Sequence, residues 1–410
     1  MSNPTAANLS ERVSRLPGME WVLPALDGLP PTYLVGGAVR DLLVGQDFVD
    51  LDLTVEGDAV AAAHELAAHL GGEAVTHERF GTATVRAGGV VVDLATSRRE
   101  TYERPGALPE VESAPLVEDL ARRDFSVNAM AIALSEPGRG ELRDPHGGFG
   151  DLAVARIRVL HDRSFIDDPT RLLRALRYEG RLGFGLERDT EALARQAAAA
   201  GALSTVSGPR IREELMELLG EHAAPVAIGR MRDLGVAAAL HPALRADPEL
   251  VAAALLGAGE TGAQPALTAL AALSSADPGA VEPFVAGLGL PARDRDVVMR
   301  AARQAPTLPA ALGAEPPPSG LHALLAGEPP EALALALALG APAEPVLRFL
   351  TDLRGTRLEI GGQDLIDAGV PRSEAIGKAL EQTLRRKLDG KVSGRDEELR
   401  TALELVRAEA

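Results

Sequence analysis

Apolar and polar positions alternate over residues 48–55, which is the pattern of a strand with one buried face. Leu51 and Leu53 fall on one face of this strand, and Asp50 and Asp52 fall on the other. Carboxylates two residues apart on a strand have Cα atoms about 6–7 Å apart. Two such groups repel each other unless a cation lies between them, so the pattern predicts a metal site at Asp50 and Asp52.

Short β-like runs and helical runs alternate around this strand. Gly88-Gly89 separates two of the β-like runs and predicts a hairpin. The segment 98–115 is polar and contains three prolines, so we expect a mobile loop there. The other expected elements are strands at 32–35, 82–86 and 90–95 and helices at 38–44 and 59–70.

From about residue 155 onward the pattern is that of helices. Leu172, Leu173 and Leu176 form an apolar stripe at helical spacing, and long Ala- and Leu-rich segments follow. The proline-rich stretch 305–330 predicts a linker or an irregular connection. We therefore expect an α+β protein in which a head with a small mixed sheet precedes an all-α remainder. The expected parts are 1–154, 155–222, 223–330 and 331–410.

Composition narrows the possible chemistry. The chain has 410 residues, which suggests about two to four domains. Its net charge of −17 argues against a generally basic nucleic-acid surface, although arginines crowd residues 156–181 and allow a basic cleft on an acidic body. The chain has no cysteine, so any metal is held by oxygen or imidazole, and carboxylates favour Mg²⁺ or Mn²⁺.

The chain also lacks the apolar stretches that membranes require. No run of about 18 apolar residues predicts a membrane span, and the polar segment 1–15 lacks the apolar core of a secretion signal. Together with the absence of cysteine, this pattern favours a cytoplasmic protein without a membrane partner.

Gly36 and Gly37 lie directly after the strand at 32–35 and before a helix. Two glycines let the backbone approach a ligand closely, and the helix start favours a phosphate, to which Arg40 can add a charge-assisted contact. Taken alone, a Gly-Gly pair is usually a turn and an Asp-x-Asp pair is usually a solvated face. Their combination indicates nucleotide chemistry, and the absence of G-x-G-x-x-G disfavours a dinucleotide-binding fold. Asp93 is a candidate third carboxylate, although a solvated or structural role is equally open.

Two further motifs combine arginine with aspartate. Arg122-Arg123-Asp124 suggests a triphosphate clamp with its own acidic partner, or else a surface cluster of salt bridges. Asp168, Arg171, Arg174 and Arg177 recur every three residues on a helix that begins near Pro169. An Asp that accepts and an Arg that donates hydrogen bonds can read the edge of a base, although a capped amphipathic helix gives the same pattern.

These motifs, in this order, resemble those of the class II tRNA nucleotidyltransferases (CCA-adding enzymes) and the related bacterial poly(A) polymerases. The resemblance is strong over residues 30–220, and a segment starting at Ile360 is similar to the family's tail. The matching motifs are Gly36-Gly-Ala-Val-Arg-Asp41 with Asp50-x-Asp52, Arg122-Arg-Asp-Phe-Ser-Val-Asn-Ala129, Asp144-Pro-His-Gly-Gly-Phe-Gly-Asp-Leu152, and Asp167-Asp168-x-x-Arg171.

The resemblance implies a fold and a division of roles. The fold is a polymerase-β-like nucleotidyltransferase head with a five-stranded sheet, then a helical neck, body and tail that hold the acceptor arm of tRNA. Asp50 and Asp52 would bind two Mg²⁺ ions, and Asp93, placed beside them by the strand pattern alone, stays a candidate catalytic residue. The triphosphate would be held by Gly36, Gly37, Arg40 and Arg123, and CTP or ATP would be selected by Asp168 and Arg171 with Arg174 and Arg177 nearby.

Two departures bear on what is added to the RNA. The base-selecting motif usually begins with Glu, where this chain has Asp167. The segment 98–115 corresponds to a flexible loop that supports the switch from C to A addition, so its presence argues against a CC-only enzyme. Its sequence is also similar to that of family members that add only the terminal A.

The resemblance leaves several functions open. Full CCA addition and A addition alone are the leading hypotheses, with CTP, ATP and tRNA as partners. A poly(A) polymerase is disfavoured because the C-terminus lacks a basic extension. A catalytically silent RNA-binding relative is disfavoured because Asp50, Asp52 and Arg123 are intact. The oligomeric state is not predicted.

Overall fold

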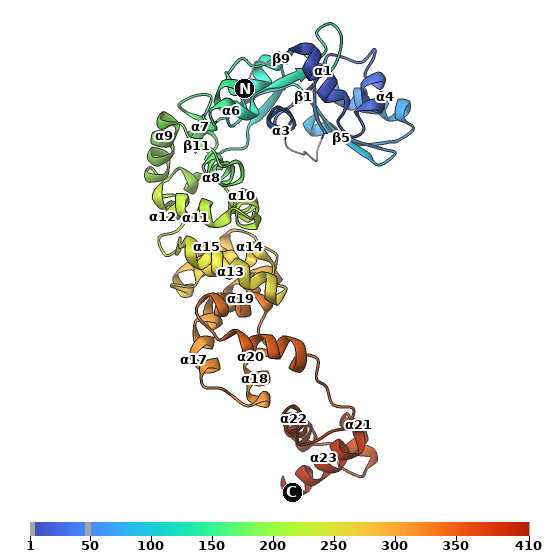
Figure 1. Cartoon of the computed structure of the whole chain (residues 1–410), viewed down its shortest axis with the longest axis vertical. Helices are drawn as coiled ribbons and strands as arrows, with labels where there is room; N and C mark the ends of the chain where they lie inside the picture. The colour runs from blue at the N-terminus through green and yellow to red at the C-terminus, as the bar shows by residue number, and fades with distance from the viewer. Residues whose placement is uncertain (1–4, 46–50, 410) are drawn as a thin grey trace. The chain divides into compact units, whose positions relative to one another are not determined.

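The computed structural model describes residues 5–45 and 51–409, and the chain divides into two compact units (Figure 1). The first unit comprises Met1–Glu214 with Asp233–Ala239, and the second comprises Leu215–Arg232 with Leu240–Ala410. The large sheet lies in the first unit, and the described part of the second unit is helical. The expected α+β class is confirmed, whereas the finer division into four parts stays a prediction.

The first unit is built on a seven-stranded sheet with the strand order β3-β4-β5-β2-β1-β8-β9. Strands β2 and β5 are parallel, and the other neighbouring pairs are antiparallel. The strands of this sheet are β1 Thr32–Val35, β2 Leu51–Val55, β3 Glu73–His77, β4 Thr82–Ala87, β5 Val90–Thr96, β8 Ala131–Ala133 and β9 Leu142–Arg143.

The resemblance implied five strands, and the structure adds strands beyond that core. The edge strand β9 has only two residues, and β3 at the opposite edge alternates exposed with half-buried positions. Neither strand carries the buried apolar face by which a strand is recognised from sequence. The hairpin expected around Gly88-Gly89 is confirmed as β4 and β5.

One face of the sheet forms the core and the other carries the acidic side chains. Helix α4 (Ala59–Leu70) packs on β3, β4 and β5. The side chains of Leu53 and Leu94 are each 1% exposed. Because side chains alternate along a strand, Asp52 and Asp93 lie on the opposite face, where both are exposed.

Helix α4 begins and ends where its sequence predicts. The Asp58 side chain accepts hydrogen bonds from the backbone N–H groups of Val60 and Ala61 at 2.9 and 3.0 Å, which caps the first turn. Gly71 ends the helix in a left-handed conformation with φ 64°. The other helices that begin in the first unit are α1 Ala6–Ser14, α2 Met19–Ala25, α3 Gly37–Val44, α5 Leu116–Ala121, α6 Gly148–Ala153, α7 Ser164–Asp167, α8 Arg171–Leu182, α9 Arg188–Ala199, α10 Gly208–Gly220 and α12 Val236–Leu240.

The segment predicted to be a mobile loop is a hairpin, which corrects that expectation. Strands β6 (Arg98–Thr101) and β7 (Glu110–Ser113) pair antiparallel. Charged side chains across the pair hold it, since Arg99 donates to Glu112 at 2.9 and 2.5 Å. The sequence pattern misled because β7 is exposed along its whole length and therefore shows no apolar alternation. A further short pair joins β10 (Arg156–Ile157) to β11 (Gly185–Leu186).

The described part of the second unit is built from α-helices that range from 6 to 15 residues. The expected linker at 305–330 is wrong, because this stretch carries α17 and α18. Its prolines stand at or near helix starts, where a missing N–H costs little. The helices that follow α10 outside the first unit are α11 Ala224–Asp233, α13 Pro248–Thr261, α14 Pro265–Ser274, α15 Pro278–Gly287, α16 Ala292–Gln304, α17 Leu308–Gly313, α18 Pro318–Leu325, α19 Pro330–Ala338, α20 Ala343–Arg348, α21 Gly362–Asp367, α22 Glu374–Leu388 and α23 Arg395–Glu409.

Candidate functional site

A cavity of about 550 Å³ in the first unit gathers most of the residues that the motifs single out. Its wall carries arginines and carboxylates together, so the basic cleft allowed by the sequence is in fact mixed in charge. The arginines are Arg40, Arg122, Arg123, Arg171, Arg174 and Arg181, and the carboxylates are Asp41, Asp52, Glu100, Asp124 and Asp168.

The glycine loop forms one corner of this cavity. Gly36 has φ 67° and ψ −131°, a backbone conformation that side chains rarely tolerate. A Cβ atom at Gly36 would lie 2.8 Å from Nη1 of Arg123, so the glycine also makes room for that guanidinium. Gly37 begins α3, whose first N–H groups and dipole favour an anion. The loop and Arg123 thus form a single corner whose geometry and charge suit an anion.

The buried carboxylate of Asp119 holds the side chains of Arg122 and Arg123 in place. Its carboxylate is fully buried and accepts hydrogen bonds from Arg122 Nε and Nη2 at 3.0 and 2.8 Å and from Arg123 Nη2 at 2.9 Å. Burial by itself would raise the pKa of Asp119, but the charges of Arg123 and Arg122 outweigh it and hold the pKa below its ordinary value. The carboxylate therefore stays ionised and fixes both guanidinium groups.

Arg40 reaches the cavity but already has partners of its own. Its side chain is buried, and Nε and Nη2 donate to Asp41 at 2.8 and 3.0 Å. Nη1 donates to Oδ1 of Asn128 at 2.7 Å. A Cβ at Gly37 would lie 3.4 Å from Nη2 of Arg40. The geometry makes Arg40 a support of the glycine loop as well as a candidate phosphate ligand.

Tyr178 lies at the centre of an arginine cluster that joins α3 to α8. The Cζ atoms of Arg40, Arg174 and Arg177 lie 5.5, 5.7 and 5.3 Å from its ring centroid. Cations at such distances are attracted to an aromatic ring. Burial raises the pKa of the Tyr178 hydroxyl, so this group stays neutral. Attraction to the Tyr178 ring thereby offsets part of the repulsion between the three guanidinium groups.

Asp124 and Glu214 supply the negative charge for this cluster. Arg174 donates to Asp124 at 2.9 and 2.8 Å and to Glu214 at 2.8 Å, and Arg177 donates to Glu214 at 3.2 Å. Burial would raise the pKa of Asp124, but the Arg174 charge and a hydrogen bond from Asn128 hold it below its ordinary value. Asp124 thus stays ionised, and its hydrogen bonds together with those of Glu214 hold the two arginines in place.

Asp168 and Arg171, the expected base-selecting pair, lie at the start of α8 and both line the cavity. Arg171 is 5% exposed, and Nη1 donates to Oγ of Ser164 at 2.7 Å. Its Nη2 donates to the backbone carbonyl of Arg122 at 2.6 Å. This last bond connects the motif expected to select the base directly to the arginine motif.

The exposed face of β2 and β5 lies beside this cavity. Asp52 stands opposite Asp93 in the parallel pair, and Asp93 accepts a hydrogen bond from Oγ1 of Thr84 at 2.5 Å. A groove of about 340 Å³ contains all three residues and shares Asp52, Arg122 and Arg123 with the main cavity. Asp50, predicted to bind metal with Asp52, lies outside the described residues. Within residues 5–45 and 51–409, no group of three or more metal-ligating side chains is assembled.

The structure thus brings together most of the expected residues. Asp93 lies in the adjoining groove rather than in the main cavity. Arg177 is not part of the cavity wall and instead packs against Tyr178 and Glu214. The expected residues that line the main cavity are Gly36, Gly37, Arg40, Asp52, Arg123, Asp168, Arg171 and Arg174.

Several lining residues were not chosen from the sequence. Arg122 and Asp124 were named within the triphosphate-clamp motif but were not among the expected site residues, and nothing in the sequence marks Asn128 as a cavity residue. Glu100 and Tyr102 fall in the segment interpreted as a loop. The described lining residues outside the expected set are Ala38, Asp41, Glu100, Tyr102, Arg122, Asp124, Asn128, Tyr178 and Arg181.

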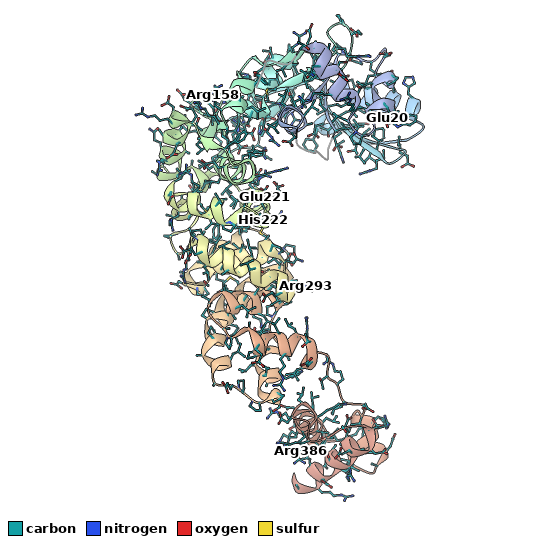
Figure 2. All side chains as sticks on the ribbon, in the orientation of Figure 1. Glu20, Arg158, Glu221, His222, Arg293 and Arg386 are labelled. Carbon is teal, nitrogen blue, oxygen red and sulfur yellow. The ribbon has the colours of Figure 1, made fainter. Side chains whose placement is uncertain are left out.

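At least one arginine of the arginine-rich stretch 156–181 lies outside the cavity and makes only structural contacts. Arg158, labelled in Figure 2, donates to Asp151 at 2.8 Å and to the carbonyl of His146 at 2.6 Å. It does not line the cavity. The charge count of the stretch therefore overstated how basic the cavity is.

Comparisons with known proteins give this geometry a context. Residues 32–158 match the family model "Poly A polymerase head domain". Residues 183–247 match the model "Probable RNA and SrmB- binding site of polymerase A". No helix of the described chain is long and apolar enough to span a membrane.

Two curated relatives match about half of this chain. The A-adding tRNA nucleotidyltransferase of Geobacter sulfurreducens is 46% identical over 215 residues, which are 52% of this chain and 24% of that protein. The CC-adding tRNA nucleotidyltransferase of Deinococcus radiodurans is 43% identical over 212 residues, or 52% and 55% of the two chains. The match thus spans between a quarter and about half of the relatives' lengths.

A solved structure matches along nearly the whole chain. The Thermotoga maritima CCA-adding enzyme complexed with tRNA is 30% identical and has a TM-score of 0.78, with 99% of both chains covered. The match therefore extends from the sheet-bearing unit through the helical one. The chain belongs to the family of class II tRNA nucleotidyltransferases (CCA-adding enzymes) and bacterial poly(A) polymerases.

Proposed function

We propose that the protein transfers nucleotides from CTP and ATP to the 3′ end of tRNA, without a nucleic acid template, and releases pyrophosphate. One observation carries the proposal: a single cavity joins the glycine loop, Asp52, Arg123 and the pair Asp168/Arg171. An anion-binding corner suits a triphosphate, and an adjacent donor–acceptor pair suits the edge of a base. The proposal places the protein in the cytoplasm.

The carboxylate face suits a divalent metal ion. Nucleotidyltransferases generally use divalent metals, and the finer assignment proposed here is Mg²⁺ or Mn²⁺ at Asp50 and Asp52. Asp52 is exposed and lines the cavity, and the only other described carboxylate paired with it across the strands is Asp93. Oxygen ligands of this kind suit a hard cation. Such a metal would activate the RNA 3′ hydroxyl and stabilise the leaving pyrophosphate.

The remaining residues bind and orient the nucleotide. Arg123, held by Asp119, would place the triphosphate against the glycine loop. Asp168 would accept from the amino group of the base while Arg171 donates to the neighbouring ring nitrogen. Positioning of this kind raises the rate of nucleotide transfer, because the reacting groups are already aligned when the nucleotide is bound. Asp93 is proposed to assist from the adjoining groove, and the helical unit to hold the acceptor arm of tRNA.

Addition of the terminal A is the step that we place first. The Geobacter relative is named for A addition and is 46% identical over the matched residues, compared with 43% for the CC-adding relative. The hairpin at 98–113 is ordered beside the cavity and contributes Glu100 and Tyr102 to its wall. Both features favour an enzyme that accepts ATP.

The test uses three tRNA substrates with Mg²⁺: one that ends before CCA, one after C and one after CC. Each is incubated with CTP, with ATP and with both. We expect ATP to be added to the CC-ended tRNA as a single nucleotide. Full CCA on the shortest tRNA would extend the proposal to both bases.

Other outcomes separate the competing functions. The head-domain model is named for poly(A) polymerases, and long A tracts on any RNA would favour that activity instead. Addition of C without A would point to a CC-adding enzyme. No incorporation by the wild-type protein on any substrate would contradict the proposal and favour an RNA-binding role.

A further inference from the structure

Arg210, near the start of α10, connects the base-selecting aspartate to the hairpin. Its Nη2 donates to Oδ1 of Asp168 at 2.8 Å, and its Nη1 donates to the carbonyl of Gly106 at 3.0 Å. The side chains of Arg210 and Asp168 are 20% and 18% exposed. Arg210 lies more than thirty residues beyond the motif at 167–171 and is not part of any pattern that the sequence revealed.

The hydrogen bonds to the Asp168 side chain converge on one oxygen. Besides Arg210, the N–H and the hydroxyl of Thr170 donate to Oδ1, at 3.2 and 2.7 Å. Within the described part of the chain, no hydrogen bond to the other oxygen, Oδ2, is present. Three donors on Oδ1 fix the plane of the carboxylate and leave Oδ2 as an acceptor for a ligand.

We propose that Arg210 is a positioning residue that makes this site select bases with an amino group. The inference rests on the proposed function. Adenine and cytosine present an amino donor at N6 or N4, whereas guanine and uracil present a carbonyl oxygen at the corresponding position. A fixed carboxylate oxygen accepts from the amino group and repels the carbonyl. If the carboxylate can rotate, its oxygens no longer face the base at a fixed angle. The preference for bases with an amino group over bases with a carbonyl oxygen then falls.

Gly106 sets the position of Arg210 from the hairpin side. Its N–H donates to the carbonyl of Asp167 at 3.2 Å, and its carbonyl accepts from Arg210. Gly106 is buried with φ 69°, and a Cβ there would lie 2.3 Å from Oγ1 of Thr205. A larger residue must therefore move the hairpin away. The hairpin end, Arg210 and Asp168 form one connected chain of contacts, which we call the Arg210 latch.

The test is Arg210→Gln, which removes the charge but keeps a polar side chain. The measured quantity is the ratio of kcat/KM for ATP to that for GTP on CC-ended tRNA. A charge-assisted hydrogen bond contributes enough that we expect the ratio to fall roughly tenfold or more. Gly106→Ala should also lower this ratio, although Arg210 and Asp168 themselves are not substituted, because the displaced hairpin no longer holds Arg210 in position.

A matched control distinguishes positioning from stability. Arg139 also donates to a backbone carbonyl, that of Leu134 at 2.9 Å, and to an aspartate, Asp27 at 3.0 Å, and it does not line the cavity. Arg139→Gln should leave the ATP:GTP ratio at its wild-type value. An equal loss for both nucleotides in Arg210→Gln, with the ratio unchanged, would overturn the proposal.

Equilibrium binding separates this proposal from the proposed function. The dissociation constants of ATP and GTP, measured by calorimetry on the wild-type and variant proteins, require no transfer reaction. If the wild type adds no nucleotide but binds ATP more tightly than GTP, and Arg210→Gln removes that preference, the latch stands and only the transfer activity fails. If the wild type adds nucleotides and both ratios survive the substitution, only the latch fails.

Discussion

The two units of this chain bury polar groups in different ways. In the first unit, most of the buried polar side chains that line the cavity or hold its arginines are charged: Asp119, Asp124 and Arg171 are 0%, 8% and 5% exposed. In the second unit, many are hydroxyls. Thr268 and Ser274, for example, each donate at 2.8 Å to the carbonyl four residues earlier in their own helix.

The difference shows where the molecule accepts a cost in stability. A hydroxyl that bonds within its own helix is buried at little expense. Buried charges require a large desolvation energy, which paired partners offset only in part, and apolar residues are often at least as stable in their place. The clustering of charges around the cavity is therefore best explained by ligand binding rather than by stability.

The largest expected effect is the loss of transfer in Asp52→Asn. Asp52 is exposed, so the fold should tolerate the change, while the loss of the charge proposed to bind the metal should lower kcat at least about a thousandfold. Single-nucleotide addition to CC-ended tRNA measures the rate, and chemical denaturation measures stability. Asp93→Asn in the same assay asks whether the second carboxylate contributes. If the Asp52→Asn variant retains nucleotide transfer, Asp52 is not a ligand of the catalytic metal.

Asp119→Asn should break the buried charge network of the first unit. Loss of the carboxylate leaves Arg122 and Arg123 without their shared counter-charge, so the free energy of unfolding should fall by about 3 kcal/mol. The dissociation constant of ATP should rise as well, because Arg123 is no longer held against Gly36.

The matched control lies in the second unit. Glu398 is also fully buried and accepts from Lys387 at 2.6 Å and from the N–H of Glu359 at 2.7 Å. Glu398→Gln should lower stability while leaving ATP binding unchanged. Equal effects of the two variants on ATP affinity would erase the proposed contrast between the units.

A smaller effect is expected from acid. Asp119 and Asp124 have folded-state pKa values below the ordinary 3.8, so the unfolded chain binds more protons between the two values. The stability they contribute is therefore complete above about pH 5 and is lost as the pH falls through 3.8 toward the folded pKa values. Denaturation at stepped pH between 6 and 3 measures this slope. It should be shallower in Asp119→Asn, and an unchanged slope would mean that Asp119 does not contribute to it.

The local elements of the first unit were largely predictable. Strand β1 and helix α4 agree with their expected ranges because each carries an unambiguous pattern of apolar residues with a turn or cap at its end. The hairpin at 98–113 and the helices near 305–330 were not predicted. The hairpin is held by exposed charge pairs, which leave no apolar pattern in the sequence. The helices near 305–330 have prolines at their starts, and such prolines look like those of a linker.

The sequence by itself determined which chemical groups are available: the glycine pair, the strand carboxylates, the arginine motif and the donor–acceptor pair at 168 and 171. Each belongs to a short segment whose local pattern is readable, and a resemblance to a family placed them in order. Only the tertiary structure decided that Arg174 reaches Asp124 and Glu214, that Arg171 donates to the carbonyl of Arg122, and that Arg210 ties Asp168 to the hairpin. These contacts join distant segments, and the packing that creates them leaves no periodic trace in the chain.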